Sequence, residues 1–496
     1  MSPGTGGALS SGDREHAVVE AVPTELFVNG QWRPSGGGKT FDVEDPSTGK
    51  VLRAVADATV EDGMAALDAA VAAQAGWARY PPRERGEILR RAYEVMMARQ
   101  EDLALLMTLE MGKPVAESRG EIAYAAEFLR WFAEEAVRID GGFAVAPGGS
   151  GRVLVMRQPV GPSLLITPWN FPTAMGTRKI GPAVAAGCTM VLKPASLTPL
   201  SMLAVADILA ECGLPPGVLN VVPSSSAGRL MEPLIRDGRA RKLSFTGSTE
   251  VGRLLLEQCA EQIMRTSMEL GGNAPFLVFA DADLDAAVGG AMVAKMRNIG
   301  EACTAANRFY VHAEVVEEFS RRLAEQMGSL RIGRGSDEGV DVGPLIEARA
   351  REKVRQLVDD AVARGAQVLV GGEPVDGPGY FYRPTVLVDV PPDAELTSTE
   401  IFGPVAPIIA FTDEQQVLAA ANDSPFGLVS YVYTSDLNRA LRVCERLEAG
   451  MVGLNQGLVS NPAAPFGGIK HSGLGREGGA VGIEEFLETK YVAVAT

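Results

Sequence analysis

The sequence predicts a soluble α/β protein with two large domains, each built on a mainly parallel sheet. Two observations predict this fold class. Short apolar runs alternate with helix-like segments in two successive series, which is the pattern of βαβ units. The chain also has 496 residues, which is too long for one hydrophobic core, and its 46% hydrophobic content is that of a globular protein.

The first series follows a short strand-like opening at residue 26 and two amphipathic helices at 85–99 and 101–111. We expect its strands at 163–167, 189–192, 218–222, 242–246 and 275–279. The second series has a helix near 315–327 and strands at 308–312, 367–370, 385–390, 405–411 and 429–433. Residues 152–157 and 490–496 are expected to be edge strands that pair across subunits, since an exposed edge is otherwise a liability. Residues 1–22, rich in Gly, Ser and charge, are expected to be a mobile tail outside the fold.

Composition excludes several classes of function. A net charge of −16 argues against nucleic acid or an anionic membrane as partner, and an anionic substrate would need a local group of arginines. The five cysteines are scattered without a CxxC pair, so we expect neither a disulfide framework nor a metal site. No apolar stretch is long enough to cross a bilayer and no signal peptide is evident, so a cytoplasmic protein is expected.

Cys303 is the one cysteine whose surroundings suggest chemistry. It lies in a Gly-containing loop, Arg-Asn-Ile-Gly-Glu-Ala-Cys (297–303), before an apolar strand-like run. Such a loop can expose the thiol to substrate and to backbone N–H groups that lower its pKa. An intracellular cysteine is more often a small buried hydrophobe, so this reading depends on other residues.

Two predicted strand ends are suited to a dinucleotide. The strand at 242–246 is followed by Gly247 and by Ser248, which stands where a helix would begin. The strand at 189–192 is followed by Lys193 and Ser196, a cation and a hydroxyl. A Gly at a strand-to-helix turn often has only a structural role, but two such ends in succession favour a nucleotide site.

Five motifs together resemble the NAD(P)-dependent aldehyde dehydrogenase superfamily over residues 26–491. They are Pro-Trp-Asn-Phe-Pro (168–172), Phe-Thr-Gly-Ser-Thr (245–249), Met-Glu-Leu-Gly-Gly-Asn (268–273), the Cys303 segment and Glu-Ile-Phe-Gly-Pro (400–404). The resemblance implies a Rossmann-like cofactor domain (23–139 and 160–269) and an α/β catalytic domain (270–476). It also implies a small β oligomerisation element (140–159 and 477–496) in a homodimer or homotetramer.

The resemblance also implies catalytic roles. Cys303 would add to the aldehyde carbonyl, and Asn170 with the Cys303 backbone N–H would hold the resulting oxyanion. Glu269 would be the base that deacylates the thioester, with a pKa raised by partial burial. Lys179 matches a position implicated in proton relay, although a lysine on a helix is usually solvated. From local sequence alone, Asn170 could be a turn residue and Glu269 a loop cap.

The cofactor would be NADP in preference to NAD. Glu400 resembles the residue that holds the nicotinamide ribose, and Phe402 the one that packs near the ring. Many NAD-preferring relatives carry a glutamate where this chain has Ser196, so a 2′-phosphate is not repelled and can meet Lys193. The full set of expected cofactor contacts is Thr167, Pro168, Trp169, Lys193, Ser196, Gly247, Ser248, Val251, Leu270, Glu400 and Phe402.

Three residues resemble the carboxylate-binding group of succinate-semialdehyde dehydrogenases. Arg178, Arg297 and Ser460 would bind the distal carboxylate while the aldehyde reaches the thiol. The expected reaction is oxidation of succinate semialdehyde to succinate, which would fit 4-aminobutyrate degradation. Glutarate semialdehyde is the alternative substrate, and a non-catalytic ligand-binding protein is the alternative of another class. Both arginines could instead be ordinary surface arginines in salt bridges.

Overall fold

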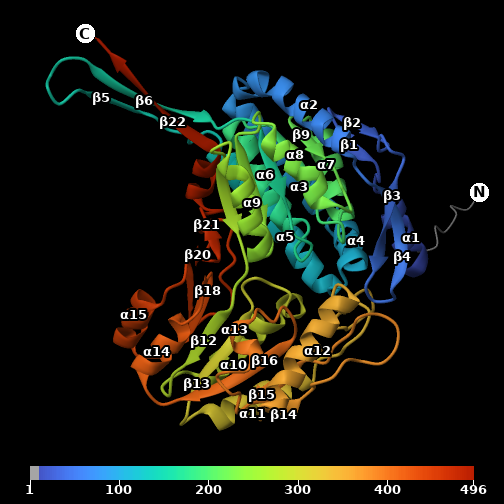
Figure 1. The fold of residues 1–496 in the computed structure, drawn as a ribbon, viewed down its shortest axis with the longest axis vertical. Helices are drawn as coiled ribbons and strands as arrows, with labels where there is room; N and C mark the ends of the chain where they lie inside the picture. Colours follow the sequence, from blue (N-terminus) through green and yellow to red (C-terminus); the bar gives the residue numbers. More distant parts are fainter. Residues whose placement is uncertain (1–10, 496) are drawn as a thin grey trace, which may run out of the picture.

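The computed structural model describes residues 11–495, which form two lobes and a protruding small sheet (Figure 1). The first lobe has an eight-stranded sheet in the order β2-β1-β9-β8-β7-β10-β11-β21. Its central strands β9, β8, β7, β10 and β11 are mutually parallel. Its strands are β1 Leu26–Val28, β2 Gln31–Arg33, β7 Ser163–Ile166, β8 Met190–Lys193, β9 Leu219–Val221, β10 Lys242–Thr246, β11 Arg265–Glu269 and β21 Gly473–Leu474. The central strands are buried, as parallel strands covered on both faces must be.

Each face of this sheet has its own apolar core. One core contains side chains of α2, α8 and α9, and the other contains side chains of α3 to α7. The helices are α2 Val60–Ala78, α3 Pro82–Ala98, α4 Gln100–Met111, α5 Val115–Glu135, α6 Ala174–Ala186, α7 Leu200–Glu211, α8 Ala227–Arg236 and α9 Thr249–Ala260. The two-layer covering explains why the strand signal was a continuous apolar run and not an alternation.

The second lobe has a seven-stranded sheet in the order β14-β15-β16-β13-β12-β18-β19, and only β14 runs antiparallel. Its strands are β12 Ala274–Val278, β13 Ala306–His312, β14 Gln367–Val370, β15 Thr385–Val388, β16 Val405–Phe411, β18 Val429–Tyr433 and β19 Met451–Leu454. Its helices are α10 Leu284–Met296, η1 Arg297–Gly300, α11 Val316–Gly328, α12 Ala348–Ala363, α13 Glu395–Ser398, α14 Glu414–Asn422 and α15 Leu437–Arg446. Two strand pairs, β3 Thr40–Asp45 with β4 Lys50–Ala56 and β17 Phe426–Gly427 with β20 Ile469–Lys470, complete the two lobes.

The assignment of 275–279 to the first sheet is wrong. β12 pairs with β13 and β18 of the second sheet, and the strand that follows β10 in the first sheet is β11, which the sequence did not reveal. β11 carries Arg, Thr, Ser and Glu among its five residues, so it lacks the apolar run that marks its neighbours. In addition, β21 returns from the C-terminal part of the chain to pair with β11, so the segment 270–476 is not confined to the second lobe.

The two predicted edge strands pair with each other in the same chain. β22 Leu487–Val494 and β6 Arg152–Pro159 are antiparallel, and β5 Gly142–Val145 adds a third strand. This sheet extends from the first lobe (Figure 1), with Phe143 and Tyr491 largely exposed. β6 therefore has partners on both sides and is not an edge strand, whereas β22 lies at the edge of this sheet and its pairing across subunits stays a prediction. Thr496 lies outside the described residues.

The expectation of a mobile tail is wrong for residues 11–22. Residues Ser11–Glu20 form α1, and Val18, Val19 and Val22 are buried in the core of the first lobe. Arg53 donates hydrogen bonds to the carbonyls of Val19 and Val22, and Glu15 pairs with Arg334 at 2.8 Å. The apolar valines, not the composition of the segment, decide its placement. Residues 1–10 lie outside the described residues.

Candidate active site

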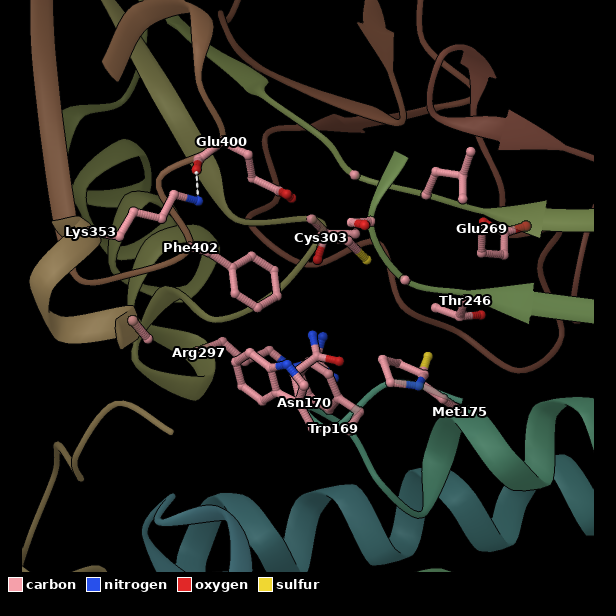
Figure 2. A pocket seen from close by; sticks show the side chains of 18 of the residues that line it. Trp169, Asn170, Met175, Thr246, Glu269, Arg297, Cys303, Lys353, Glu400 and Phe402 are labelled. Atoms are coloured by element: carbon pink, nitrogen blue, oxygen red, sulfur yellow. Dashed lines mark hydrogen bonds between the residues drawn. The ribbon is translucent and has the colours of Figure 1, made fainter. Parts of the chain in front are cut away.

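A cavity of about 710 Å³ lies where strand ends of the two lobes face each other. Thr246 at the end of β10 and Glu269 at the end of β11 enter it from the first lobe, and Cys303 enters from the loop before β13. Figure 2 shows Cys303 with Glu269 on one side, Glu400 and Phe402 on the other, and Asn170 and Trp169 opposite. The carboxyl ends of parallel strands are where such folds bind ligands.

A strained turn delivers Cys303 to this cavity. Asn298 and Ile299 in η1 have positive φ of 54° and 53°, which is costly for residues with a side chain. The turn is held by buried hydrogen bonds: the Glu117 carboxylate accepts from the Asn298 N–H at 2.7 Å, and Asn298 Nδ2 donates to Glu301 O at 2.9 Å. At Gly300, with φ of 78°, a Cβ would lie 2.2 Å from the Gly403 carbonyl oxygen, so only glycine fits.

Cys303 has a thiol with a raised pKa. Burial raises its pKa to about 12, and the nearby Arg178 only partly opposes this. The expectation that the loop lowers this pKa is therefore wrong in the absence of substrate and cofactor. The loop is closely packed, since a Cβ on Gly272 would meet the Cys303 carbonyl oxygen at 2.4 Å. Because only the thiolate is a nucleophile, a thiol with a raised pKa needs a nearby proton acceptor in order to react.

Hydrogen bonds hold Asn170 in place and use one of its two side-chain amide N–H groups. Its Nδ2 donates to the Glu301 carbonyl at 2.9 Å, and its own backbone carbonyl accepts from Lys113 Nζ at 2.8 Å and from Asn298 Nδ2 at 3.0 Å. A primary amide has two N–H donors, so the second can point at the cavity that Asn170 lines beside Cys303. This is the arrangement expected of a preorganised oxyanion donor.

Sequence reasoning missed the buried ion pair beneath Asn170. Lys113 Nζ lies 2.6 Å from Glu121 Oε2, and the other Glu121 oxygen accepts from the N–H groups of Thr173 and Ala174 at the start of α6. The pair therefore ties α5 to the turn that carries Asn170. Charged residues on the inward face of a helix were the available signal, but which residues they meet could not be deduced from spacing.

Glu269 lies at the end of β11 with 2% of its surface exposed. Within residues 11–495 neither carboxylate oxygen has a hydrogen-bond partner. Burial and repulsion from Glu477 raise its pKa well above the usual range, in the direction that the sequence predicts. A carboxyl group of this kind can take up and release a proton near neutral pH.

Arg178 and Lys179 both pair with Glu477 behind the cavity. Lys179 is fully buried and donates to Glu477 Oε1 and to Ser244 Oγ, so it is not solvated, and burial lowers its pKa. Arg178 Nε lies against Glu477 Oε2, its Nη2 donates to Met175 Sδ, and its guanidinium stacks 4.1 Å from the Phe466 ring. Arg178 lines the cavity as predicted, and of its terminal nitrogens Nη1 has no hydrogen-bond partner within residues 11–495. The ion pair with Glu477 also fits the alternative of a salt-bridged arginine, so binding of the carboxylate by Arg178 stays a prediction.

Arg297 and Ser460 come together as the sequence predicts. Arg297 Nη1 donates to Ser460 Oγ at 3.0 Å, and its guanidinium lies 4.7 Å from the ring of Phe171. Both residues line the cavity, although 163 positions separate them in the chain. No other hydrogen bond of this guanidinium is found within residues 11–495, which suits its remaining N–H groups to an anionic substrate group.

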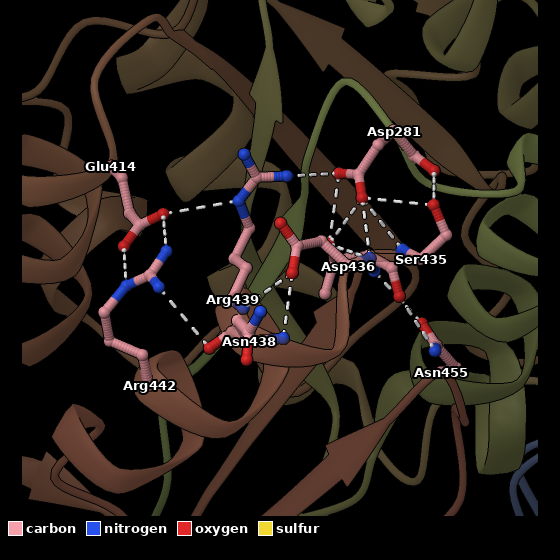
Figure 3. Close-up of polar contacts among 9 residues, drawn as sticks. Asp281, Glu414, Ser435, Asp436, Asn438, Arg439, Arg442 and Asn455 are labelled. Atoms are coloured by element: carbon pink, nitrogen blue, oxygen red, sulfur yellow. Dashed lines mark hydrogen bonds and ion pairs between the residues drawn. The ribbon is translucent and has the colours of Figure 1, made fainter.

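A polar network anchors the loop that carries Ser460. Asn455, with φ of 50°, bonds through its side chain to both the N–H and the carbonyl of Thr434 at 3.1 and 3.0 Å. Asp281 accepts from the Thr434 and Ser435 hydroxyl groups and pairs with Arg439, which also contacts Glu414 (Figure 3). The network joins the ends of β12 and β18 to α15, so the loop starts from a rigid point.

The nicotinamide end of the expected cofactor site is assembled in the same cavity. Pro168, Trp169, Gly247, Ser248, Leu270, Glu400 and Phe402 all line it. Ser248 caps α9 by accepting from the Val251 N–H at 3.3 Å, as its position after β10 predicts. Glu400 accepts from the Gly272 N–H at 3.0 Å, and burial raises its pKa to about 7. Phe402 meets Trp169 edge to face at 5.4 Å.

Four expected cofactor contacts lie outside the lining of this cavity: Thr167, Lys193, Ser196 and Val251. Lys193, at the end of β8, is 5% exposed, and burial lowers its pKa to about 8 against the attraction of Asp57. Asp57 is itself bound by the hydroxyl groups of Ser224 and Ser225. Lys193 is thus a buried cation without a carboxylate hydrogen bond in the described chain, and an anion such as a phosphate would stabilise its charged form.

The fold and the site define the class of protein. Residues 32–492 match the aldehyde dehydrogenase family, and the chain belongs to this family. Within residues 11–495, no helix has the length and apolar character needed to cross a membrane.

Individual relatives match over almost the whole chain. The succinate-semialdehyde dehydrogenase of Paenarthrobacter nicotinovorans is 61% identical over 90% of this chain and 99% of that protein. The NADP(+) succinate-semialdehyde dehydrogenase of Escherichia coli and the glutarate-semialdehyde dehydrogenase of Pseudomonas putida are each 51% identical over 95% of this chain, and over 97% and 98% of those proteins. A crystal structure of an NADP-dependent enzyme of E. coli superimposes with a TM-score of 0.95 at 50% identity, covering 96% of this chain and 98% of that one. The predicted fold and family are confirmed.

Proposed function

We propose that this protein oxidises succinate semialdehyde to succinate with NADP as the preferred oxidant, through a thioester on Cys303. The observation that carries the proposal is the Arg297 and Ser460 pair, which lines the same cavity as Cys303 and Asn170. An anionic group of the substrate can bind this pair while the aldehyde carbon reaches the thiol. The succinate-semialdehyde dehydrogenases at 61% and 51% identity support this substrate.

The residues divide the chemistry among them. Cys303 adds to the carbonyl after losing its proton to Glu269, the nearby carboxyl group with the raised pKa. The free Asn170 amide N–H and the Cys303 backbone N–H stabilise the oxyanion, and losing one such donor typically costs about 3 kcal/mol. Glu269 then activates the water that cleaves the thioester. Lys179 and Glu477, which both interact electrostatically with Glu269, are suited to carry its proton away from the site.

The chain's own residues fit an NADP molecule. Glu400 would hold the nicotinamide ribose, Phe402 and Trp169 would pack near the ring, and the α9 N-terminus at Gly247 and Ser248 would receive the pyrophosphate. Lys193, a buried cation lacking a carboxylate hydrogen bond, would meet the 2′-phosphate beside the neutral Ser196. When bound, the cofactor accepts hydride from the substrate carbon. NAD, which lacks that phosphate, would be accepted less well.

Glutarate semialdehyde is a second candidate substrate. A glutarate-semialdehyde dehydrogenase is as similar to this chain, at 51% identity, as the E. coli succinate-semialdehyde dehydrogenase. The same Arg297 and Ser460 pair would bind the carboxylate of the longer molecule. The two candidates differ only in the distance between that carboxylate and Cys303.

The same proposal includes a homo-oligomer, dimeric or tetrameric, in the cytoplasm, acting in 4-aminobutyrate degradation. The exposed aromatic side chains Phe143 and Tyr491 on the protruding sheet support its role as the oligomerisation element. The first lobe would bind the cofactor and the second would carry the thiol, with boundaries near residues 139, 159, 269 and 476.

A panel of kcat/KM values tests the proposed function. It compares semialdehydes of three to six carbons with uncharged aldehydes of the same length, using NADP and NAD in turn. We expect succinate semialdehyde to exceed butyraldehyde by about a hundredfold or more, since a carboxylate held by a guanidinium contributes about 3 kcal/mol. Equal values for the charged and uncharged aldehydes would contradict the proposal.

A further inference from the structure

Tyr124 places an unsatisfied hydroxyl group at the substrate end of the cavity. It lies on α5, lines the cavity, and its ring is held edge to face against Phe128 at 4.8 Å. The hydroxyl oxygen is buried and makes no hydrogen bond of ordinary geometry within residues 11–495, although Arg178 and Ser460 both lie close enough to interact with it. A buried phenol without a hydrogen bond is unfavourable, and because this one lines the cavity, a bound ligand can supply the hydrogen bond.

The surroundings of this hydroxyl group are cationic. The Arg297 guanidinium lies 5.9 Å from the Tyr124 ring centre, on the same side of the cavity as Ser460. Burial raises the pKa of Tyr124, while Arg178, Arg297 and Ser460 oppose the rise, so the phenol is neutral at physiological pH. Guanidinium groups only donate hydrogen bonds, so neither arginine can accept the phenol proton. Ser460 Oγ can accept this proton but already accepts from Arg297 Nη1, and the positive surroundings favour an anionic acceptor from the substrate.

Arg178 leaves room for such a role. Its Nε is engaged by Glu477 and its Nη2 by Met175, so it offers less to a substrate than a free guanidinium would. Tyr124 lies beside it on a helix that is packed into the core of the first lobe, which fixes the position of its donor. Ser460, by contrast, lies on a loop.

We propose that the Tyr124 hydroxyl group donates a hydrogen bond to the distal carboxylate of the substrate and is a specificity-determining residue together with Arg297 and Ser460. The inference rests on the proposed function, because it concerns the same carboxylate. A carboxylate has about four acceptor positions and no donor, so it can receive the phenol proton, the Ser460 hydroxyl and the Arg297 fork at once. An uncharged aldehyde offers no acceptor at this end.

The test is Tyr124→Phe in the full-length protein, which keeps the ring and removes only the hydroxyl group. We expect KM for succinate semialdehyde to rise about 10- to 100-fold, the range for a lost hydrogen bond to a charged group. The kcat/KM for butyraldehyde and KM for NADP should change by less than about twofold. Affinity for succinate, measured by calorimetry without turnover, should fall by the same factor as KM rises.

Tyr382→Phe is the matched control. Tyr382 also has a buried hydroxyl group without a partner in the described chain, but it does not line this cavity, so its loss should leave both substrates unaffected. If Tyr124→Phe leaves the ratio of the two aldehydes unchanged, or lowers both equally, the inference is overturned. If the unaltered protein itself fails to prefer succinate semialdehyde over butyraldehyde, the proposed function fails instead, so the two failures are distinguishable.

Discussion

Replacing Arg297 by methionine should separate recognition of the carboxylate from the chemistry of the aldehyde. The change removes the guanidinium that bonds Ser460 at 3.0 Å but keeps an apolar stem against Phe171. At an effective dielectric of about 20, a unit charge pair at about 4 Å contributes about 4 kcal/mol, and a charged hydrogen bond contributes about 1.5–3 kcal/mol. Since the substrate loses water to make these contacts, we take about 3–4 kcal/mol, which corresponds to a 10²- to 10³-fold loss of kcat/KM.

The assay compares succinate semialdehyde with butyraldehyde in the variant and in the unaltered protein. Loss of the stacking on Phe171 and of the Ser460 contact affects both aldehydes, so the ratio of the two kcat/KM values isolates the carboxylate. Butyraldehyde should lose less than about tenfold, because exposed cation–π contacts contribute only about 0.5–1 kcal/mol. Arg297→Lys keeps the charge without the fork and should fall between the two. Equal losses for both aldehydes would refute the reasoning.

Three further outcomes are expected. Alkylation of Cys303 by iodoacetamide in the free protein should accelerate about tenfold per pH unit from pH 7 to 10, because the thiol pKa is about 12 and only the thiolate reacts. Peptide mass mapping, with Cys303→Ser as control, measures the alkylation rate. A rate that reaches a plateau below pH 9 would contradict the raised pKa. The Kd for NADP, but not for NAD, should rise by up to tenfold per pH unit above about pH 8, where Lys193 loses its proton. Parallel plots of Kd against pH for the two cofactors would exclude a contact between Lys193 and the 2′-phosphate. In addition, Ser196→Glu should lower the NADP/NAD ratio of kcat/KM at pH 7. Val19→Ser should lower Tm by several degrees, since burial of a valine side chain contributes about 1.5–3 kcal/mol. Glu20→Ser on the same helix removes only an exposed ion pair and should change Tm little. Equal shifts of Tm in the two variants would argue against packing of α1 on the core.

Several parts of the site could be read from local sequence. Strand β10 is predicted with its observed bounds, and Ser248 caps the following helix, because an apolar run and a capping residue are local signals. The Cys303 loop and the Asn170 turn were recognised from short motifs. Strand β11 was missed because it is polar, although it carries Glu269.

Contacts between distant segments could not be read in this way. Glu477 pairs with Arg178 and Lys179 across about 300 residues, and Lys113 supports Asn170 from the connection between α4 and α5. The same holds for residues 11–22, whose composition is that of a tail but whose three valines are buried in the core of the first lobe. In each case the partner is chosen by packing, and no spacing in the chain encodes it.

The sequence by itself determined the class of reaction and the type of fold, because the proposed nucleophile, oxyanion donor and base and the parallel-strand pattern are each carried by a few neighbouring residues. Only the tertiary structure decided the state of those groups. Burial raises the pKa of Cys303 to about 12 and, within residues 11–495, leaves the Glu269 carboxylate without a hydrogen-bond partner, and the ion pair with Glu477 occupies part of the Arg178 guanidinium. Electrostatic energies depend on distance and desolvation in three dimensions, so they are fixed only when both lobes enclose the cavity.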